Sequence, residues 1–299
     1  MSALPDPEPQ DSNPVTSDDT SPKTKRRMST GQRLLFFLTA WLICLMPFLF
    51  WWKTWFGRPL PDNELVEYLN DEKKPRHIQQ ALVQIGERIG KHDVSVARWY
   101  PDLIRLSMYP VEEIRNTDAW VMGQDTSGAG FHETLLRMLS DPSPMVRGNA
   151  ALSLVRFGDA SGRAEIVRLL QPAVITAPQT GTITDTSAVG TVTHQNGVVA
   201  KLQAGGQATE IRSPIGGRIR TLSVQTGRNV VGGTEIATVA PGTDQVWEAL
   251  RALYLIGQLD DLPAVMPYER ELPDIPDHVR QQAKDTEQAI RDRAGKAGG

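Results

Sequence analysis

The chain has 299 residues, of which 40% are hydrophobic and 22% charged, and its formal net charge is −3. At roughly 150 residues per domain this length predicts about two domains, and the composition excludes a wholly disordered protein, a collagen-like fibre and a multi-span membrane protein. The 32 basic and 35 acidic residues nearly balance, so the charge gives no indication of nucleic-acid binding. A single cysteine, Cys44, excludes an intrachain disulfide framework and a cysteine-based zinc site.

Residues 1–33 are rich in Pro, Ser, Asp and Thr and have almost no large apolar side chains. Such a segment cannot bury enough apolar surface to offset the entropy lost on ordering, so we expect a disordered cytoplasmic tail.

Residues 34–56 have the opposite character and predict a single transmembrane helix. The run 34–52 has nineteen positions without a charge, and Trp51, Trp52 and Trp55 cluster at its distal end. At ~1.5 Å per residue such a helix is ~28 Å long, which matches the hydrocarbon core of a bilayer, and tryptophan is typical of the headgroup interface. A cleaved signal peptide is the alternative, but this run exceeds the roughly 7–15 apolar residues of a signal peptide, and no small-x-small cleavage site follows.

The charges around the apolar run predict its orientation. Five basic residues precede it closely, whereas only Lys53 and Arg58 follow; the five are Lys23, Lys25, Arg26, Arg27 and Arg33. The positive-inside rule places the N-terminus in the cytoplasm. We therefore expect a single-pass protein of the bacterial inner (cytoplasmic) membrane, with the bulk of the chain in the periplasm.

Residues 62–171 have the pattern of paired amphipathic helices. In 133–158, a first helix face is followed by the turn Asp141-Pro142 and a second face formed by Val146, Ala150, Leu154 and Phe157. Arg115 lies 32 residues before Arg147, which marks an upstream copy, and a looser copy begins at Leu65. A period in the thirties built from two helices predicts a solenoid, in which each unit buries its apolar face against its neighbours.

The clearest unit resembles a HEAT repeat of the phycobilisome-lyase type. The second helix of that repeat has a Val-Arg-x-x-Ala-Ala-x-x-Leu pattern, which fits Val146, Arg147, Ala150, Ala151 and Leu154. The upstream copies fit less well. This resemblance implies a helical solenoid that binds other proteins.

Residues 172–242 are rich in Gly, Thr and Val and alternate with period two, so they predict short strands joined by turns. The segment also contains a duplication at an offset of 36 residues. Ile175, Pro178, Gly181, Ile183 and Gly197 recur as Ile211, Pro214, Gly217, Ile219 and Gly233. We expect the repeated glycines to adopt positive φ where the strands turn.

These halves resemble the biotinyl/lipoyl-like barrel-sandwich hybrid, most clearly over residues 211–233. Carrier domains of that family need a lysine in the hairpin between the halves, where this chain has Gly205-Gly206-Gln207. Lys201 lies 13 residues before Pro214, and we interpret it as a solvated strand residue, so the module is unmodified and needs no cofactor. Membrane fusion (periplasmic adaptor) proteins use an unmodified domain of this type, but only eight residues, 203–210, are available here for their long helical hairpin.

The helical pattern resumes at 243–293. Ala151-Leu152-Ser153-Leu154 matches Ala252-Leu253-Tyr254-Leu255 at an offset of 101 residues, and Asp159 matches Asp260; the 71-residue β segment accounts for all but 30 of these. Residues 294–299 are expected to be a disordered tail. The predicted fold is therefore multi-domain, α plus β: a HEAT-like solenoid interrupted by a small all-β barrel-sandwich hybrid, behind one N-terminal transmembrane helix.

Nothing in the sequence predicts a catalytic, cofactor-binding or metal-binding residue. The five histidines are scattered, His194 has no partner that a zinc peptidase would need, and capping or solvation explains the acidic pairs Glu112-Glu113 and Asp260-Asp261. We therefore predict a non-enzymatic, membrane-anchored scaffold or adaptor that binds an unidentified envelope or transporter protein, attaches to the membrane through residues 34–52, and binds neither nucleic acid nor a small-molecule cofactor. Two alternatives stay open: a hairpin-less adaptor subunit of an efflux or secretion transporter, and a carrier modified with biotin or lipoate.

Overall fold

The computed structural model describes residues 31, 36–43, 45–46, 59–271 and 274–297, and the chain divides into two units, Met1–Pro59 and Leu60–Gly299. In the first unit, residues 36–43 and 45–46 are helical and carry exposed apolar side chains such as Phe37 and Trp41. Most of the predicted tail, and residues 34–35, 44 and 47–52 of the predicted span, lie outside the described residues. Within the described ranges, no helix has the length and apolar character needed to cross a bilayer.

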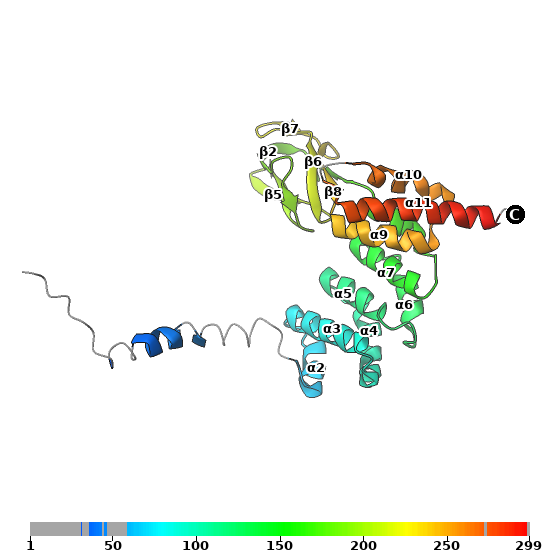
Figure 1. The fold of residues 1–299 in the computed structure, drawn as a ribbon. Helices are drawn as coiled ribbons and strands as arrows, with labels where there is room; N and C mark the ends of the chain where they lie inside the picture. The colour runs from blue at the N-terminus through cyan, green and yellow to red at the C-terminus, as the bar shows by residue number, and fades with distance from the viewer. Residues whose placement is uncertain (1–30, 32–35, 44, 47–58, 272–273, 298–299) are drawn as a thin grey trace, which may run out of the picture. The chain divides into compact units, whose positions relative to one another are not determined.

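The helices of the second unit come in pairs (Figure 1). The first three pairs are α2 (Asp62–Leu69) with α3 (Pro75–Gly90), η1 and α4 (Val94–Trp99, Tyr100–Leu106) with α5 (Glu112–Met122), and α6 (Phe131–Met138) with α7 (Pro144–Arg156). The last two are α8 (Arg163–Leu169) with α9 (Thr243–Ile256), and the short helices η2, α10 and η3 (Leu259–Asp261, Leu262–Val265, Met266–Glu269) with α11 (Asp277–Ala297). The second helices α3, α5, α7, α9 and α11 pack on one another in that order, so the predicted helical repeat array is confirmed.

Local sequence explains why these helices begin where they do. At α7, Pro144 occupies the first helical position, and the Ser143 hydroxyl accepts hydrogen bonds from the backbone N–H groups of Met145 and Val146 at 3.2 and 3.4 Å. Val146, Ala150 and Leu154 are then fully buried, as their spacing predicts.

The sequence match between α7 and α9 is wrong by two residues. Leu154 is fully buried, but its predicted partner Leu255 is 60% exposed; Leu253, at an offset of 99, takes the buried position instead. Two residues rotate a helix by roughly 200°, which moves a side chain to the opposite face. A similar Ala-Leu-x-Leu run had matched letters from different faces.

The C-terminal helix is longer than predicted. Its inward stripe of Val279, Ala283, Thr286 and Ile290 is buried, but α11 continues to Ala297 through residues assigned to a disordered tail. Alanine is the best helix former, and Lys296 lies favourably in the last turn, so the local sequence supports this extension.

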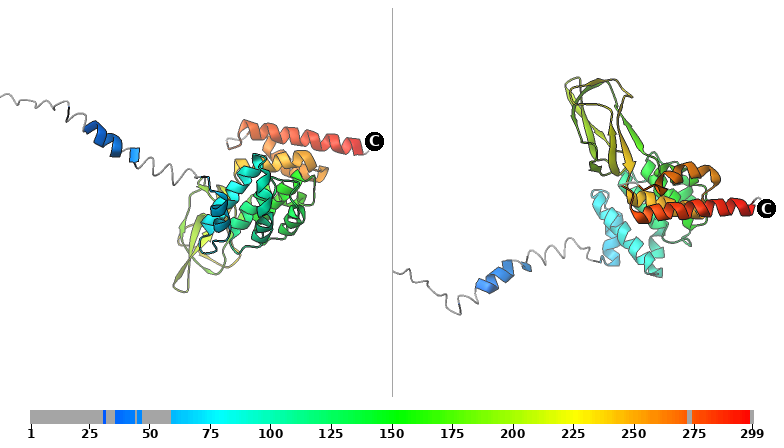
Figure 2. Two further views of the ribbon diagram at one scale, coloured as in Figure 1. Left: turned by 90° about the horizontal axis from the view of Figure 1, so that it is seen from below. Right: turned by 45° about the horizontal axis from the view of Figure 1, so that its top comes forward.

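The β module occupies the connection between α8 and α9 and stands out from one side of the helical array (Figure 2). It consists of two four-stranded antiparallel sheets. One has the order β1 (Ala173–Thr176), β8 (Glu235–Pro241), β6 (Gly217–Leu222), β3 (Val192–Thr193), and the other β5 (Gln207–Arg212), β4 (Val198–Ala204), β2 (Gly181–Thr186), β7 (Asn229–Val230). Both described sheets are open rather than closed into a barrel, and they share one apolar core that includes Ile183, Leu202, Ile219 and Val239.

The two sheets are related by an internal two-fold. Exchanging each strand of the first half with the strand four places later converts one sheet order into the other. The backbone hydrogen bonds repeat as well: Ile183 N–H donates to Arg228 O at 2.9 Å, and Ile219 N–H donates to Thr191 O at 3.0 Å. The duplication seen in the sequence therefore corresponds to two equivalent structural halves.

The offset between the halves changes from 36 to 37 residues, because the β6–β7 connection is one residue longer than the β2–β3 connection. The predicted match of Gly197 with Gly233 is thus wrong by one. Asn196 has φ 61° and Gly233 has φ 86°, so these two residues occupy equivalent left-handed positions. Asparagine tolerates this region better than most other residues with a side chain.

Gly181 and Gly217 are equivalent but do not have the positive φ that was expected of them. They are needed for close approach instead. A Cβ atom on Gly181 would lie 2.5 Å from Gln203 O, and one on Gly217 would lie 1.9 Å from Ala240 O. In both halves, the absence of a side chain lets two strands cross.

Candidate functional site: a groove along the second helices

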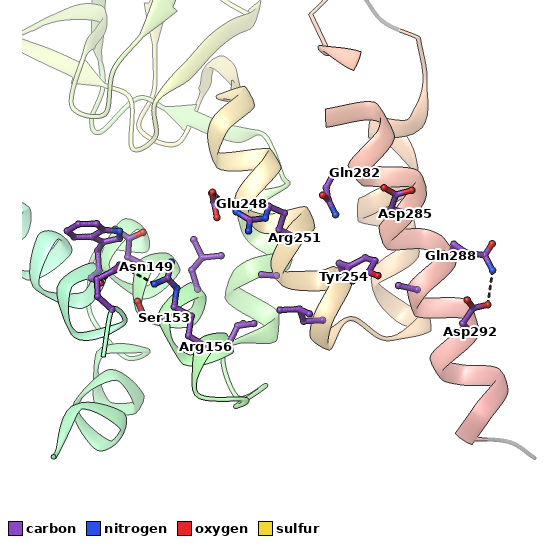
Figure 3. Close-up of a pocket in the computed structure, with 17 residues that line it drawn as sticks. Asn149, Ser153, Arg156, Glu248, Arg251, Tyr254, Gln282, Asp285, Gln288 and Asp292 are labelled. Carbon is purple, nitrogen blue, oxygen red and sulfur yellow. Dashed lines mark hydrogen bonds and ion pairs between the residues drawn. The ribbon is translucent and has the colours of Figure 1, made fainter. Parts of the chain in front are cut away.

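A groove of about 850 Å³ crosses the second helices of the last four pairs (Figure 3). In the figure, side chains of α7 and α11 lie on opposite sides, and α9 lies between them. The groove thus draws on α5, α7, α9 and α11, whose residues are far apart in the sequence. The lining residues that matter below are Trp120, Asn149, Arg156, Glu248, Arg251, Tyr254, Leu255, Asp285, Gln288 and Asp292.

The surface between the walls is partly apolar. Trp120, Tyr254 and Leu255 are 41, 44 and 60% exposed, and Leu152 and Ala289 also line the groove. Exposed apolar side chains of this size at a concave surface are typical of a protein-binding site.

Both arginines in the groove are already engaged within the chain. Arg156 donates to Gln124 Oε1 at 2.8 Å, while the Arg251 guanidinium lies 4.6 Å from the centre of the Trp247 ring and 3.3 Å from Glu248. Their charges are therefore partly satisfied before any ligand binds.

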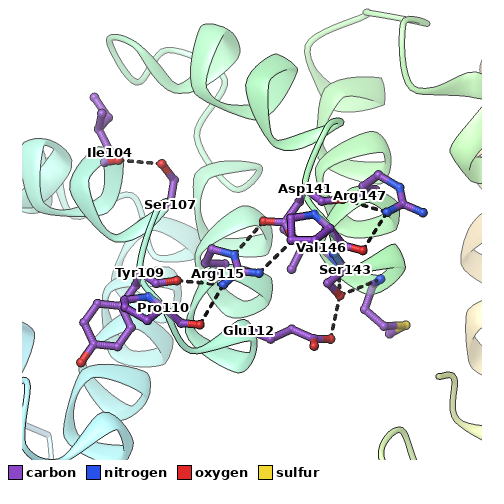
Figure 4. Close-up of polar contacts among 12 residues, drawn as sticks. Ile104, Ser107, Tyr109, Pro110, Glu112, Arg115, Asp141, Ser143, Val146 and Arg147 are labelled. Carbon is purple, nitrogen blue, oxygen red and sulfur yellow. Dashed lines mark hydrogen bonds and ion pairs between the residues drawn. The ribbon is translucent and has the colours of Figure 1, made fainter. Parts of the chain in front are cut away.

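Repeated arginine contacts hold consecutive second helices in place (Figure 4). Arg115 donates to the carbonyl oxygens of Tyr109 and Pro110, and Arg147 donates in the same way to those of Asp141 and Pro142, 32 residues later. Arg115 also forms a bidentate pair with Asp141 at 2.7 and 2.9 Å, which joins one repeat to the next. Burial raises the pKa of Asp141, but hydrogen bonds from Arg115 and Ser143 outweigh it and lower that pKa overall.

A second set of contacts ties the start of each first helix to the loop after its second helix. Tyr100 donates to Asp125, His132 lies 2.7 Å from Asp159, and Arg163 lies 2.6 Å from Asp261. The counterpart of Asp159 in the fourth pair is thus Asp261 and not Asp260. Burial first, and then the bond to Asp125, raise the pKa of Tyr100. These contacts fix the ends of the pairs and keep the helices that line the groove at a regular spacing.

Asp118 on α5 interrupts this regularity. Its side chain is fully buried, and neither carboxylate oxygen has a hydrogen-bond partner in the part of the chain that the structure describes. Burial raises its pKa well above the usual value, and nearby Arg105 opposes this only in part. The residue 32 positions later is Ala150, so Asp118 is a local departure from the repeat and not part of the groove.

The β module places the residues considered for carrier function on its surface. Gly205 and Gly206 form a two-residue turn between β4 and β5, with Ala204 paired to Gln207, and both glycines have positive φ. Lys201 lies on β4, away from this turn, with its Nζ 3.7 Å from Asp185. Across the described residues, no group of three His, Cys, Asp or Glu side chains is arranged to hold a metal ion.

The β module contacts repeats that are not its neighbours in sequence. Gln195, in the turn between β3 and β4, donates to Glu112 Oε1 at the start of α5 at 2.5 Å, and the same oxygen accepts from the Ser143 hydroxyl at 2.7 Å. Met145 on α7 packs against the core of the module. The two acidic pairs singled out in the sequence thus have structural roles: Glu112 joins three elements, and Asp261 accepts a hydrogen bond from Gln258 N–H.

The HEAT repeat model matches residues 133–161, which contain α6 and α7. No curated protein matches the chain. This chain therefore contains a HEAT repeat at the position that the sequence pattern predicts.

Similar solved structures include a designed armadillo repeat protein in complex with the peptide (KR)4, at 16% identity over 76% of this chain and 80% of that one, with a TM-score of 0.37. A second designed armadillo repeat protein has 15% identity over the same shares and a TM-score of 0.38. A single-chain, multi-domain long-chain acyl-CoA carboxylase is 13% identical over 32% of this chain and 10% of its own length, with a TM-score of 0.23. TM-scores this low do not establish a common fold.

The groove was not predicted from the sequence, although a signal for it was present. Polar residues recur at exposed positions of the second helices: Asn116 and Asn149 are 33 residues apart and hydrogen-bonded at 2.8 Å, and Gln124 pairs with Arg156. Such rows at the repeat spacing mark the open face of a solenoid.

Proposed function

We propose that this protein is a membrane-anchored, extracytoplasmic scaffold or adaptor without enzymatic activity. It binds another envelope protein through its HEAT-like repeats and an unmodified lipoyl-like β module. The observation that carries this proposal is the groove along α5, α7, α9 and α11, because it combines exposed apolar side chains with polar walls on a rigid helical array.

Two features support an interaction role for the β module. Its internal two-fold matches the resemblance to lipoyl-like domains, and the turn that would present the carrier lysine is Gly205-Gly206. A module of this kind without its lysine is suited to binding a protein rather than to carrying an acyl or carboxyl group.

The membrane anchor is proposed from the sequence. The uncharged run 34–52 and the basic residues before it support an N-terminus in the cytoplasm and a periplasmic body. Alkaline extraction should leave the full chain in the membrane and release a variant without residues 34–52. Release of both, or of neither, would contradict the anchor.

Photocrosslinking in intact membranes tests the scaffold. A photoreactive residue at Tyr254 in the groove should capture one partner stoichiometrically, whereas the same residue at Glu133, exposed on a first helix outside the groove, should not. Replacing residues 172–242 with a short linker should weaken capture. The deletion is feasible because β1 and β8 pair antiparallel, so the module leaves and rejoins the array at neighbouring points. Failure to capture any partner from Tyr254 overturns the proposal.

A scaffold is preferred over a transporter adaptor because of the short turn between the halves. The β4–β5 connection contains only Gly205 and Gly206 between paired residues, which leaves no room for a duct-contacting helical hairpin.

A further inference from the structure

The α11 wall of the groove carries uncompensated negative charge. Asp285 and Asp292 line the groove and are exposed; each accepts a hydrogen bond from a glutamine amide four residues earlier on the same helix, at 2.8 and 2.7 Å. Neither carboxylate forms an ion pair with any cation in the described ranges. Glutamine is neutral, so both charges face the groove without a counter-ion.

The cations near this wall are bound elsewhere. Arg291 pairs with Glu287, and Arg293 donates to the carbonyl oxygens of Tyr254 and Gly257. Across the groove, Arg156 and Arg251 are engaged as described above. The groove as a whole therefore presents acceptors at the α11 wall and an apolar surface at Tyr254 and Leu255.

The spacing of the two carboxylates defines what fits them. Seven residues of helix separate them, which corresponds to ~10.5 Å along the axis. An extended peptide advances ~3.3 Å per residue, so side chains three residues apart lie ~10 Å apart.

We propose that the groove takes a partner-protein segment with two cationic side chains about 10 Å apart, next to an apolar residue that packs on Tyr254 and Leu255. This proposal rests on the scaffold function and names the chemistry of the partner. Asp285 and Asp292 bind the cations, and charge complementarity selects the segment.

Fluorescence anisotropy with the full chain in detergent micelles tests the proposal. The probe is a short labelled peptide, rich in glycine, with lysines at positions i and i+3 and a leucine between them; a matched peptide has glutamates in place of the lysines. The wild type should bind the lysine peptide about tenfold more tightly. The double variant Asp285→Asn, Asp292→Asn should lose this preference, and Asp285→Lys, Asp292→Lys should reverse it. Asp260→Asn, an exposed acid outside the groove, is the control and should change nothing.

Equal binding of the two peptides, no binding of either, or unchanged preference in the Asn double variant overturns the proposal. The charge-reversed variant guards against a trivial loss of fold, because it must gain affinity for the glutamate peptide. The outcome is separable from that of the proposed function: if the Asn double variant still captures the membrane partner from Tyr254, the cation proposal fails and the scaffold stands. If the wild type captures no partner, the scaffold fails irrespective of the peptides.

Discussion

The helical array and the β module both arise from internal repetition, but the repetition is of different kinds. The helices repeat by translation, with Arg115 and Arg147 making the same contacts 32 residues apart. The β module repeats by a two-fold, so that each half supplies hydrogen-bond partners for the other.

This difference explains where each region tolerates departures. In a translational array, a repeat contacts only its neighbours, so one unit can bury an unpaired carboxylate such as Asp118 while the others keep the pattern. In the two-fold module, strands of both halves cross at Gly181 and Gly217, and neither position has room for a side chain. The array therefore leaves an open face for binding, whereas the module uses its repetition for closure.

The strongest test of this contrast is Gly217→Ala. The added Cβ would lie 1.9 Å from Ala240 O, so the strands must separate, and we expect a loss of about 3 kcal/mol in the unfolding free energy of the module. Gly181→Ala, with its nearest atom at 2.5 Å, should cost less. Gly216→Ala is the control, since its Cβ would meet nothing closer than 3.7 Å.

The measurement can separate the two regions. Residues 172–242 contain no Trp, Tyr or Phe, whereas Trp99, Trp120 and Trp247 lie in helices. In guanidinium titrations, strand circular dichroism should therefore shift while tryptophan fluorescence shifts much less. A joint shift of both signals would mean that the two regions unfold as one unit.

Arg115→Ala tests the translational contacts. It removes a bidentate pair with the mostly buried Asp141 and two bonds to the turn carbonyls, so we expect a loss of about 2 to 3 kcal/mol in the fluorescence-detected transition. Arg115→Lys keeps the charge but not the fork and should recover only part of this loss. A cost below about 0.5 kcal/mol would show that the repeated arginines do not hold the array together.

Asp118→Ala should have the opposite sign. It introduces the residue found at the equivalent position, Ala150, and removes a buried carboxyl without a partner, so we expect stabilisation by about 1 to 2 kcal/mol at pH 7. Asp118→Asn keeps the shape but leaves an unpaired amide, and should be closer to the wild type. Destabilisation by the alanine would indicate that packing at this position outweighs the polar cost.

The same position should confer a pH dependence. Burial raises the folded-state pKa of Asp118, whereas the unfolded value is about 3.9. Between these two values the folded state retains a proton that the unfolded state has lost, so the stability of the wild type falls as pH rises from about 4 to the raised pKa, then stays level. The difference in unfolding free energy between Asp118→Ala and the wild type should thus be larger at pH 7 than at pH 4. An equal difference at both would contradict a raised pKa.

The repeat periods were readable from the sequence because each carries a residue type with one physical role. Arginine at the start of each second helix, and Pro-x-x-Gly where strands cross, fixed the two periods and the boundaries of the insertion. Register was less accessible. The α7–α9 match failed by two residues and the Gly197–Gly233 match by one, because similar letters occur on different faces and because asparagine replaces glycine at Asn196.

The groove was beyond the sequence for a different reason. Its lining residues come from four helices, and three-quarters of the chain separates Trp120 from nothing in the pattern that would join it to Asp292; only packing of the second helices brings them to one surface. Asp118 was likewise placed in a helix stripe beside Ala119, but its lack of a partner depends on what surrounds it in three dimensions.

The smallest expected effect concerns the contact between the two regions. Gln195→Ala removes the bond to Glu112 but leaves the Ser143 bond to the same carboxylate, so the unfolding free energy should fall by less than about 1 kcal/mol. Hydrogen exchange is the sensitive measurement: amides in the β3–β4 turn should exchange several-fold faster, while those of the β4–β5 turn at Gly205 should not change, because that turn makes its own antiparallel pairing. Gln225→Ala, an exposed glutamine elsewhere in the module, should alter neither region. Unchanged exchange in the β3–β4 turn would mean that packing of Met145 on the module core, and not the Gln195–Glu112 bond, holds the module against the array.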